Sequence, residues 1–384
     1  YTDPNSNITT YGYDSNGNLT SRTEPEGHTV TISRSSDGLI QSITDIGTVN
    51  YGYDGDGNVT SISDPLNNTT NMNYDGVSRI ISLTNPKGKT TAYVYNENDQ
   101  VTSIENPNNG STNFTYDQNG NTISISPPGG DASIWSYVDD FLTSYSAPGA
   151  ATTYQYNGDG SISSRSRGNG TTTYQYDANG RLTLISGDNT TSLSYDNNGN
   201  ITGVSDNNGT MVFHYNALNR LLYYEDYYGN TIQYGYDDSG NITSIQYEQG
   251  KTVQYTYDDN NRMISVSDWE NNSTTYSYTS TGLLNQSSNS NGTNTSYAYD
   301  SAGRLTGLTH SKSNGIIIAS YSFTLDGLGN IINSTVTEPF DAPIFLDESV
   351  SYYHNPSNQI TSGGGYSYSY DGNGNLSNMS GTGN

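Results

Sequence analysis

Cysteine is absent from this 384-residue chain, and basic residues and long apolar runs are scarce. Without cysteine there is no disulfide framework, thiol nucleophile or thiolate metal site. Acidic residues outnumber basic ones 38 to 13, and a formal charge of −25 repels the phosphates of nucleic acids and anionic lipids. No stretch approaches the roughly 18 consecutive apolar residues of a membrane-spanning helix. We therefore expect no nucleic-acid binding and no membrane span.

Hydrophobic residues make up only 30% of the chain, against about 45 to 50% on a similar count in ordinary globular domains. Such a low fraction is typical of disorder, but charged residues are also few, at 13%. Aromatic residues reach 11%, and 36 residues are Tyr. The composition thus predicts an ordered chain. Because it starts at Tyr1, without an initiator Met or a signal peptide, we expect a mature or excised part of a longer polypeptide.

A motif with a period near 20 residues recurs along the chain. Copies include YGYDSNGNLTS from Tyr11, YGYDGDGNVTS from Tyr51 and YAYDSAGRLTG from Tyr297. The consensus is Tyr-x-Tyr-Asp-x-x-Gly-Asn/Arg-aliphatic-Thr, and its second aromatic position, here called the anchor, recurs about 18 times. The sequence therefore predicts regular repeats over residues 1–300 and less regular terminal repeats over 301–384, which continue the same sheet.

Each repeat predicts a β-hairpin, and the fold class is all-β. Alternation in Thr-Thr-Tyr-x-Tyr places both Tyr side chains on one face of a strand. Asn-Gly, Ser-Gly or Asp-Gly then supplies the positive φ angles of a tight turn before a second strand. In that strand the aliphatic residues often lie three apart, as Val59 and Ile62 do, and strict alternation would send them to opposite faces. A bulge or a sharp twist would bring them together, and the sequence leaves this open.

The repeat tyrosines are predicted to pack within the sheet, because cross-strand aromatic pairs contribute about 0.2 to 1 kcal/mol each. We therefore predict a structural aromatic ladder at these positions, with no catalytic or cofactor-binding role. Its members are Tyr11, Tyr13, Tyr51, Tyr53, Tyr93, Tyr95, Tyr154, Tyr156, Tyr174, Tyr176, Tyr234, Tyr236, Tyr255, Tyr257, Tyr276, Tyr278, Tyr297 and Tyr299.

These motifs closely resemble the YD-repeat, or RHS-repeat, family over essentially the whole chain. Its members include bacterial RHS and wall-associated proteins, shell components of Tc toxin complexes and the teneurin shell. The resemblance implies a spiral β-sheet of about 18 successive hairpins that forms an open tube or a partial cocoon. The plug segment, the autoproteolytic Asp site and the toxin of toxin-bearing members are not visible, so no catalytic residue is carried over.

The length of the predicted sheet has a consequence for assembly. About 36 strands spaced by about 4.8 Å give a sheet of the order of 170 Å, roughly one circuit of a tube about 55 Å across. One circuit does not close a cocoon, so both terminal strands would present open edges that can pair with another chain. We therefore predict self-association through open sheet edges into a tube or filament.

The Asp after each anchor is expected to accept hydrogen bonds from its own turn and not to bind metal. The segment Asp54-Gly-Asp56-Gly-Asn58 resembles a calcium loop only in part. Val59 takes the place of the required Gly, and Pro65 takes the place of the bidentate Glu.

The histidines lie in different repeats without recurring partners, so no metal site or catalytic triad is predicted, and no cofactor is expected. They are His28, His214, His310 and His354. Glu225 with Asp226 is predicted to be a solvated acidic pair. The aromatic residues outside the ladder have two interpretations, a glycan-binding platform or structural packing. They are Trp135, Trp269, Tyr223, Tyr224, Tyr227 and Tyr228.

Asn-x-Ser/Thr sequons are abundant, although the turn motif Gly-Asn-aliphatic-Thr generates several by itself. In an exported protein, exposed sequons would carry covalently attached glycans. The candidate sites are Asn7, Asn18, Asn58, Asn68, Asn113, Asn169, Asn200, Asn241, Asn291 and Asn333.

Together these observations predict a non-enzymatic structural protein, extracellular or at the cell surface, whose YD-repeat sheet assembles into a tube, surface fibre or filament. Two alternatives remain. The chain would otherwise be a shell fragment of a toxin-encapsulating cocoon, or a cell-surface adhesin that binds glycans through off-register aromatic residues.

Overall fold

The computed structural model describes residues 1–147, 150–338, 348–371 and 374–381. Within these residues every regular element is a β-strand, and neighbouring strands pair antiparallel, so the all-β prediction is confirmed. The strands of the main sheet are β1 (Thr10–Tyr13), β2 (Leu19–Thr23), β3 (Thr29–Arg34), β4 (Ile40–Thr44), β5 (Thr48–Tyr53), β6 (Val59–Ser63), β7 (Thr69–Tyr74), β8 (Ile80–Thr84), β9 (Thr90–Tyr95), β10 (Val101–Glu105), β11 (Ser111–Tyr116), β12 (Thr122–Ser126), β13 (Ser133–Val138), β14 (Phe141–Ala147), β15 (Ala150–Tyr156), β16 (Ile162–Arg167), β17 (Gly170–Tyr176), β18 (Leu182–Ser186), β19 (Thr190–Tyr195), β20 (Ile201–Asp206), β21 (Gly209–Tyr215), β22 (Leu221–Glu225), β23 (Thr231–Tyr236), β24 (Ile242–Glu248), β25 (Lys251–Tyr257), β26 (Met263–Ser267), β27 (Ser273–Tyr278), β28 (Leu284–Asn289), β29 (Thr293–Tyr299), β30 (Leu305–Lys312), β31 (Ile317–Leu325), β32 (Ile331–Thr337) and β33 (Glu348–Ser351).

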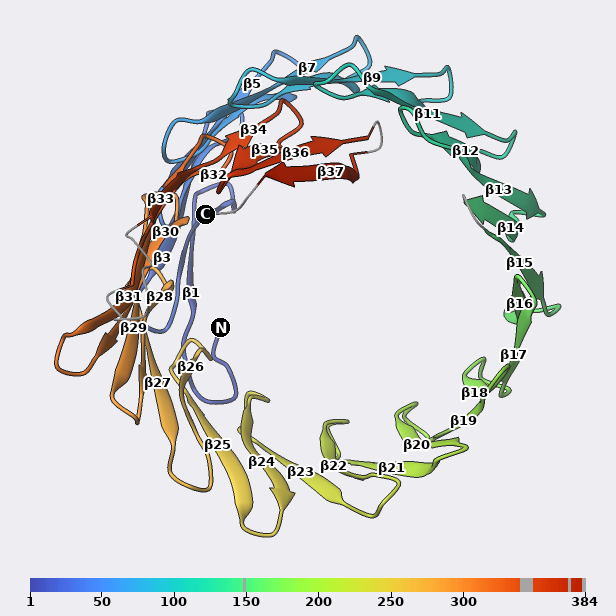
Figure 1. Cartoon of the computed structure of the whole chain (residues 1–384), viewed down its shortest axis with the longest axis vertical. Coiled ribbons are helices and arrows are strands. Elements are labelled where there is room, and N and C mark those ends of the chain that lie inside the picture. Colours follow the sequence, from blue (N-terminus) through green and yellow to red (C-terminus); the bar gives the residue numbers. More distant parts are fainter. Residues whose placement is uncertain (148–149, 339–347, 372–373, 382–384) are drawn as a thin grey trace. The chain divides into compact units, whose positions relative to one another are not determined.

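These 33 strands belong to one sheet, built from hairpins that follow one another in chain order (Figure 1). A separate four-stranded sheet follows. Its strands are β34 (Tyr353–His354), β35 (Ile360–Gly363), β36 (Tyr366–Tyr370) and β37 (Leu376–Gly381). The chain divides into two compact units. Unit 1 contains residues 1–94, 104–111 and 255–384, and unit 2 contains residues 95–103 and 112–254.

A β-bulge beside the anchor resolves the three-residue spacing of the aliphatic residues. In the β5–β6 hairpin Tyr51 pairs with Ile62, but Tyr53 pairs with Val59, because the register shifts by one residue beside the anchor. The extra residue is Thr60. Val59 and Ile62 therefore lie on the same face as the two Tyr side chains. The same shift occurs at other anchors, for example at Tyr176.

The turns that follow the anchors share a hydrogen-bond pattern, except at the two-residue turn Asp139–Asp140 between β13 and β14. In the first one, the Asp14 N–H donates to the Asn18 carbonyl at 2.9 Å, and the Gly17 N–H donates to the Asp14 carbonyl at 3.1 Å. Gly17 has a φ of +84°, a left-handed conformation in which a Cβ is strained. Where the repeat lacks Gly at this position, another residue takes the same conformation, as Asn219, Ser78 and Asp99 do with φ of +59°, +64° and +62°. The consensus Gly thus reflects the left-handed conformation that this position of the turn adopts.

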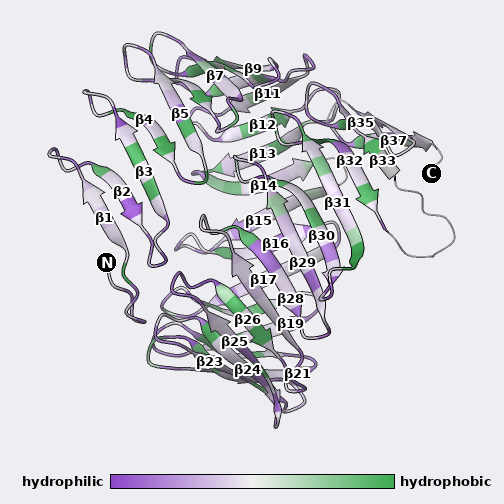
Figure 2. Ribbon diagram, turned by 90° about the vertical axis from the view of Figure 1, so that its left-hand side faces the viewer, coloured by the Kyte–Doolittle hydropathy of each residue, from purple (hydrophilic) through white to green (hydrophobic). Residues whose placement is uncertain are grey.

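The described part of the sheet has no shared hydrophobic core. Among the described residues the buried hydrophobic side chains are Met72 and Ala319, at 8% and 7% exposure. Hydrophobic residues lie on the strands, whereas the turns are largely hydrophilic (Figure 2). Packing therefore comes mainly from neighbouring hairpins, and stability is spread along the chain as in other repeat proteins. No helix in the described part of the chain is long and apolar enough to cross a membrane.

Candidate functional site

The Asp of the repeat uses its carboxylate within its own turn. Oδ1 of Asp14 accepts hydrogen bonds from the N–H groups of Asn16 and Asn18, both at 2.9 Å, and Oδ2 accepts one from Asn18 Nδ2 at 3.0 Å. These bonds, above all the one from the Asn18 side chain, lower the pKa of Asp14. Asp54 has the same contacts, so its carboxylate is engaged by the turn and is not arranged as part of a calcium loop.

The Asn/Arg position of the repeat connects one hairpin to the next. Arg181 donates from Nε to the Asp177 carboxylate at 2.7 Å, as the consensus Asn does from its amide. Its Nη1 donates to the Asp196 carbonyl in the following turn at 2.8 Å. The guanidinium also lies 4.7 Å from the centre of the Tyr195 ring, a cation–π distance. Asn and Arg both donate a hydrogen bond to the Asp of the turn, which explains why either residue fits this position of the consensus.

The anchor Tyr hydroxyls form a second connection between repeats. In many repeats this hydroxyl donates to the carbonyl of the first residue in the second strand of the preceding hairpin, or of the second residue in the case of Tyr156. Examples are Tyr53 to Ile40 at 2.8 Å and Tyr116 to Val101 at 2.6 Å. The same bond is made by Tyr74, Tyr156, Tyr176, Tyr195, Tyr215, Tyr236, Tyr278, Tyr299 and Tyr370.

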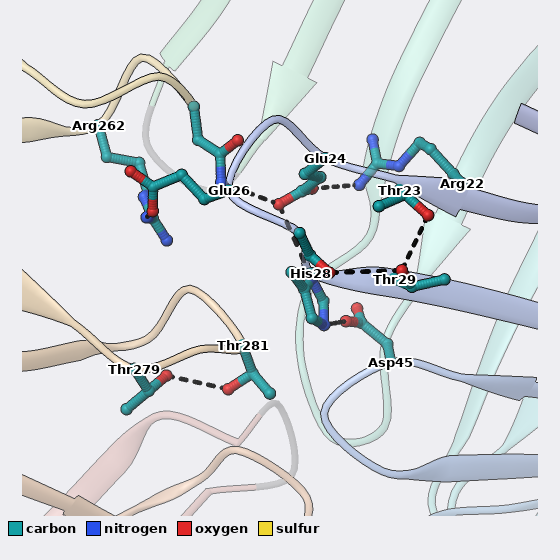
Figure 3. Close-up of polar contacts among 12 residues, drawn as sticks. Arg22, Thr23, Glu24, Glu26, His28, Thr29, Asp45, Arg262, Thr279 and Thr281 are labelled. Atoms are coloured by element: carbon teal, nitrogen blue, oxygen red, sulfur yellow. Dashed lines mark hydrogen bonds and ion pairs between the residues drawn. The ribbon is translucent and has the colours of Figure 1, made fainter. Parts of the chain in front are cut away.

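Within unit 1, turns far apart in the sequence also meet. We call this contact the seam: turns among residues 1–111 lie against turns among residues 258–359. At one end Asn260 Nδ2 donates to Glu24 Oε2 at 3.3 Å, and Arg262 forms an ion pair with Glu26 (Figure 3). The turns that join one hairpin to the next thus meet the Tyr-Asp turns of much later repeats.

The seam continues along the same two rows of turns. Lys87 Nζ lies 2.8 Å from Asp326 Oδ2, and Asn108 Nδ2 donates to Ser357 Oγ at 2.8 Å. The backbones approach closely at Gly47, where an added Cβ would lie 2.5 Å from the Ser301 carbonyl oxygen. Hydrogen bonds, ion pairs and tight packing therefore all contribute to the seam.

The estimated length of the sheet did not predict the seam. An estimate of roughly one circuit leaves the first repeats without later repeats to contact, whereas the hydrogen-bonded residues here are 236 to 258 positions apart. The predicted assembly route used strand edges, but the seam is made by turns. Its donors and acceptors belong to individual turns and follow no sequence period.

The histidines considered in the sequence analysis lie in different surroundings. Nε2 of His28 lies 3.1 Å from Asp45 Oδ1 beside the seam (Figure 3), while His214 stacks on Tyr223 with ring centres 4.1 Å apart. Nδ1 of His310 lies 2.9 Å from Thr295 Oγ1. No group of three His, Cys, Asp or Glu side chains that could hold a metal occurs among the residues described.

Many candidate glycosylation sites already use the atom to which a glycan would be attached. The amide nitrogen donates to the turn Asp in Asn7, Asn18, Asn58, Asn68, Asn200 and Asn241. Asn333 lies in β32 and is half-buried. Asn113, Asn169 and Asn291 are exposed, and modification of the predicted sites is sterically simplest at these three.

The aromatic residues outside the ladder do not share one arrangement. Trp135 packs on Tyr145 with ring centres 5.2 Å apart, and Trp269 belongs to unit 1. Tyr224 lies 5.8 Å from Phe213 between ring centres. Tyr227 and Tyr228 occupy a turn, where Tyr228 is 87% exposed. Glu225 is exposed, and Asp226 accepts the N–H groups of Tyr228 and Asn230.

This region also contains a groove that the repeat motif does not indicate. Tyr224 lines a groove together with Gln233, Gln246 and Tyr247. The two glutamines pair across neighbouring strands, but they occupy variable positions of the repeat. The sequence motif therefore could not predict the groove.

The geometry defines an all-β repeat protein made of hairpins with bulged anchors and Asp-closed turns. Comparison with family models finds the teneurin YD-shell over residues 27–192 and the RHS repeat over residues 1–29, 236–273 and 278–314. The chain belongs to the YD-repeat, or RHS-repeat, family. No curated protein sequence matches it.

Solved structures support the same fold. The crystal structure of TcdB2–TccC3–TEV matches with a TM-score of 0.69 and 13% identity over 97% of this chain and 25% of the other. TcdB2–TccC3–Cdc42 matches with a TM-score of 0.64 and 13% identity over 98% and 25%. TcdB2–TccC3 gives a TM-score of 0.64 and 12% identity over the same shares. The chain thus spans about a quarter of the length of these proteins, and at this identity the likeness shows the fold alone.

Proposed function

We propose that this chain is a wall segment of a YD-repeat shell that separates an enclosed polypeptide from its surroundings, and that it has no catalytic role itself. The observation that supports this proposal most strongly is the seam. A sheet whose later repeats dock on its own earlier repeats forms a continuous wall without a second chain. The fold likeness to TcdB2–TccC3 supports the same choice and favours the toxin-encapsulating alternative over the fibre.

The physical character of the sheet suits a wall. Its hairpins are held by hydrogen bonds between successive turns and strands, so the sheet needs no second layer to cover a core. A net charge of −25 also keeps such a large surface soluble. Because residues 27–192 match the teneurin YD-shell model, we also propose that the parent protein lies outside the cell or at its surface.

Self-assembly into a filament is the second candidate, and the terminal strands favour it. In the described sheet, β1 pairs with β2 and β33 pairs with β32, with no ladder between β1 and β33. An open strand edge can pair with another chain. In a filament, later repeats of one molecule would dock on early repeats of another.

A disulfide across the seam distinguishes the two candidates. An added Cβ at Gly327 would lie 3.5 Å from the Pro86 Cβ, within the range of disulfides. Because the chain has no cysteine, the double variant Pro86→Cys with Gly327→Cys reports on this contact alone. The control variant combines Pro86→Cys with Gly55→Cys, since a Cβ at Gly55 would meet nothing within 4 Å.

We expect the seam variant to form an intramolecular disulfide at low micromolar concentration, seen as an oxidised monomer on a non-reducing gel. The control pair should remain reduced. Cross-linked dimers and higher oligomers without an oxidised monomer would overturn the wall proposal in favour of the filament.

A further inference from the structure

A groove of about 640 Å³ lies in unit 2 on strands β22 to β25, the green-to-yellow strands of Figure 1. It is bounded by the turn at residues 226–230 and by the turn that joins β24 to β25. Its volume falls in the range of small-molecule sites, about 300 to 1,000 Å³. The turn Asp226–Asn230 in its lining follows the repeat pattern, but Gln233, Gln246 and Tyr247 lie outside the repeat consensus, so the fold alone does not explain them.

The polar groups that line the groove are mostly neutral amides and hydroxyls. Gln233 and Gln246 lie directly opposite each other on β23 and β24. Within the described residues, neither side-chain amide has a hydrogen-bond partner, and the same holds for the Tyr224 hydroxyl. Each amide offers a donor and an acceptor side by side, which matches the hydroxyl groups of a sugar.

The charged groups of the groove are already engaged. The Asp226 carboxylate accepts the N–H groups of Tyr228 and Asn230 and the Asn230 side-chain amide, each at 2.8 Å. Glu248 and Lys251 form an ion pair with each other at the end of the groove. Because Lys251, the cation that lines the groove, is paired with Glu248, and because the chain has a net charge of −25, an anionic ligand is disfavoured.

An aromatic ring completes the site. Tyr247 lines the groove and is 42% exposed, because the β24–β25 ladder skips it between Gln246 and Glu248. The bulge presents this side chain at the surface next to the two glutamines. The face of an aromatic ring carries partial negative charge and attracts the polarised C–H groups of a sugar ring.

We propose that this groove binds a neutral oligosaccharide, with the Tyr247 ring stacking on one sugar and the amides of Gln233 and Gln246 binding its hydroxyls. This is a separate activity from the wall, and it does not depend on whether the shell encloses a polypeptide. It assigns glycan recognition to Tyr247 and the two glutamines, and Tyr228 takes no part.

The test begins with the 384-residue chain on an array of neutral, sialylated and sulfated oligosaccharides. The strongest neutral glycan is then titrated by calorimetry against five variants. Tyr247→Ala should weaken binding about tenfold or more, and Gln233→Ala or Gln246→Ala about three- to tenfold. Tyr247→Phe keeps the ring, and Tyr228→Ala alters an exposed Tyr outside the groove, so both should stay within about twofold of the parent.

Circular dichroism of each variant checks that the sheet is intact. The proposal is overturned if no neutral glycan binds, if only sialylated or sulfated glycans bind, or if folded Tyr247→Ala binds as the parent does. None of these outcomes bears on the disulfide across the seam, so the wall proposal stands or falls separately.

Discussion

Lys87 Nζ lies 2.8 Å from Asp326 Oδ2, although the two residues are 239 positions apart in the sequence. The Asp326 side chain is only 10% exposed. Burial by itself raises the pKa of Asp326, but the hydrogen bonds from Lys87, from the Asn330 side chain and from the turn backbone outweigh it and lower the pKa to about 2.

Because the pKa of Asp326 is lower in the folded chain than in an unfolded one, its carboxylate stabilises the fold above about pH 4, and this stabilisation is lost as the pH falls towards 2. Lys87→Met should lower the free energy of unfolding by about 1 to 2 kcal/mol at pH 6 and by much less at pH 2. Urea unfolding at both pH values measures this. Lys89→Met, an exposed neighbour, should have little effect, and an equal loss at both pH values would contradict the prediction.

Gly47 and Gly55 form a matched pair for testing the seam. An added Cβ at Gly47 would lie 2.5 Å from both the Ser301 carbonyl oxygen and the Pro65 Cβ, whereas one at Gly55 would meet nothing within 4 Å. Neither residue has a positive φ, so backbone strain does not distinguish them. Gly47→Ala should therefore cost about 1 to 3 kcal/mol through overpacking, and Gly55→Ala should be nearly neutral.

Hydrogen exchange locates the effect of the Gly47 variant. Faster exchange is expected at residues 45–47 and 300–304, while the hairpin that contains Gly55 exchanges at the parent rate. Unchanged exchange at residues 300–304 would show that the two turns do not meet in solution.

The repeat made most of the local structure predictable. Alternation around Tyr51 and Tyr53 indicates a strand, and Asp54 followed by Gly57 indicates the turn, because each feature depends on residues within a few positions. The bulge was left open because Val59 and Ile62 are compatible with either a bulge or a twist. Register depends on the partner strand, and the sequence of one strand does not contain it.

The seam and the groove could not be predicted for a different reason. Lys87 and Asp326 are ordinary turn residues in their own repeats, and only the accumulated geometry of the intervening hairpins brings them together. Gln233 and Gln246 occupy variable positions, where nothing in the motif indicates a role. Periodicity predicts the structure that all repeats have in common. The seam and the groove are formed by residues that differ from one repeat to another.

The anchor hydroxyl can be tested with Tyr116 and Tyr13. Tyr116 donates to the Val101 carbonyl at 2.6 Å. Tyr13 holds the same position in the first repeat, is 62% exposed and makes no such bond. Tyr116→Phe should cost about 1 kcal/mol, because it leaves the carbonyl without its donor. Tyr13→Phe should be neutral within about 0.3 kcal/mol. Thermal unfolding of both variants measures the difference. Equal effects would show that the anchor hydroxyl does not stabilise the packing of successive repeats.

The role of the turn Asp can be tested at Asp300, because Asn96 replaces it at the same position of another repeat. Oδ1 of Asp300 accepts the N–H groups of Ala302 and Arg304, both at 3.0 Å, and Oδ2 accepts Arg304 Nε at 2.8 Å. Asn96 holds the same position in another repeat and accepts the N–H groups of Asn98 and Gln100, again at 3.0 Å.

An amide oxygen is therefore sufficient to close the turn. Asp300→Asn should cost less than about 0.5 kcal/mol near neutral pH, whereas Asp300→Ala leaves two backbone donors unsatisfied and should cost about 1 to 2 kcal/mol. Chemical unfolding gives both values, and added calcium should change neither. Burial raises the pKa of Asp300, but the bonds from Arg304 and Ala302 lower it overall, so the advantage of Asp over Asn is present above about pH 4 and fades as the pH falls below it. If Asn proved as costly as Ala at pH 7, the ion pair with Arg304 rather than the turn would be the reason that Asp recurs at this position of the repeat.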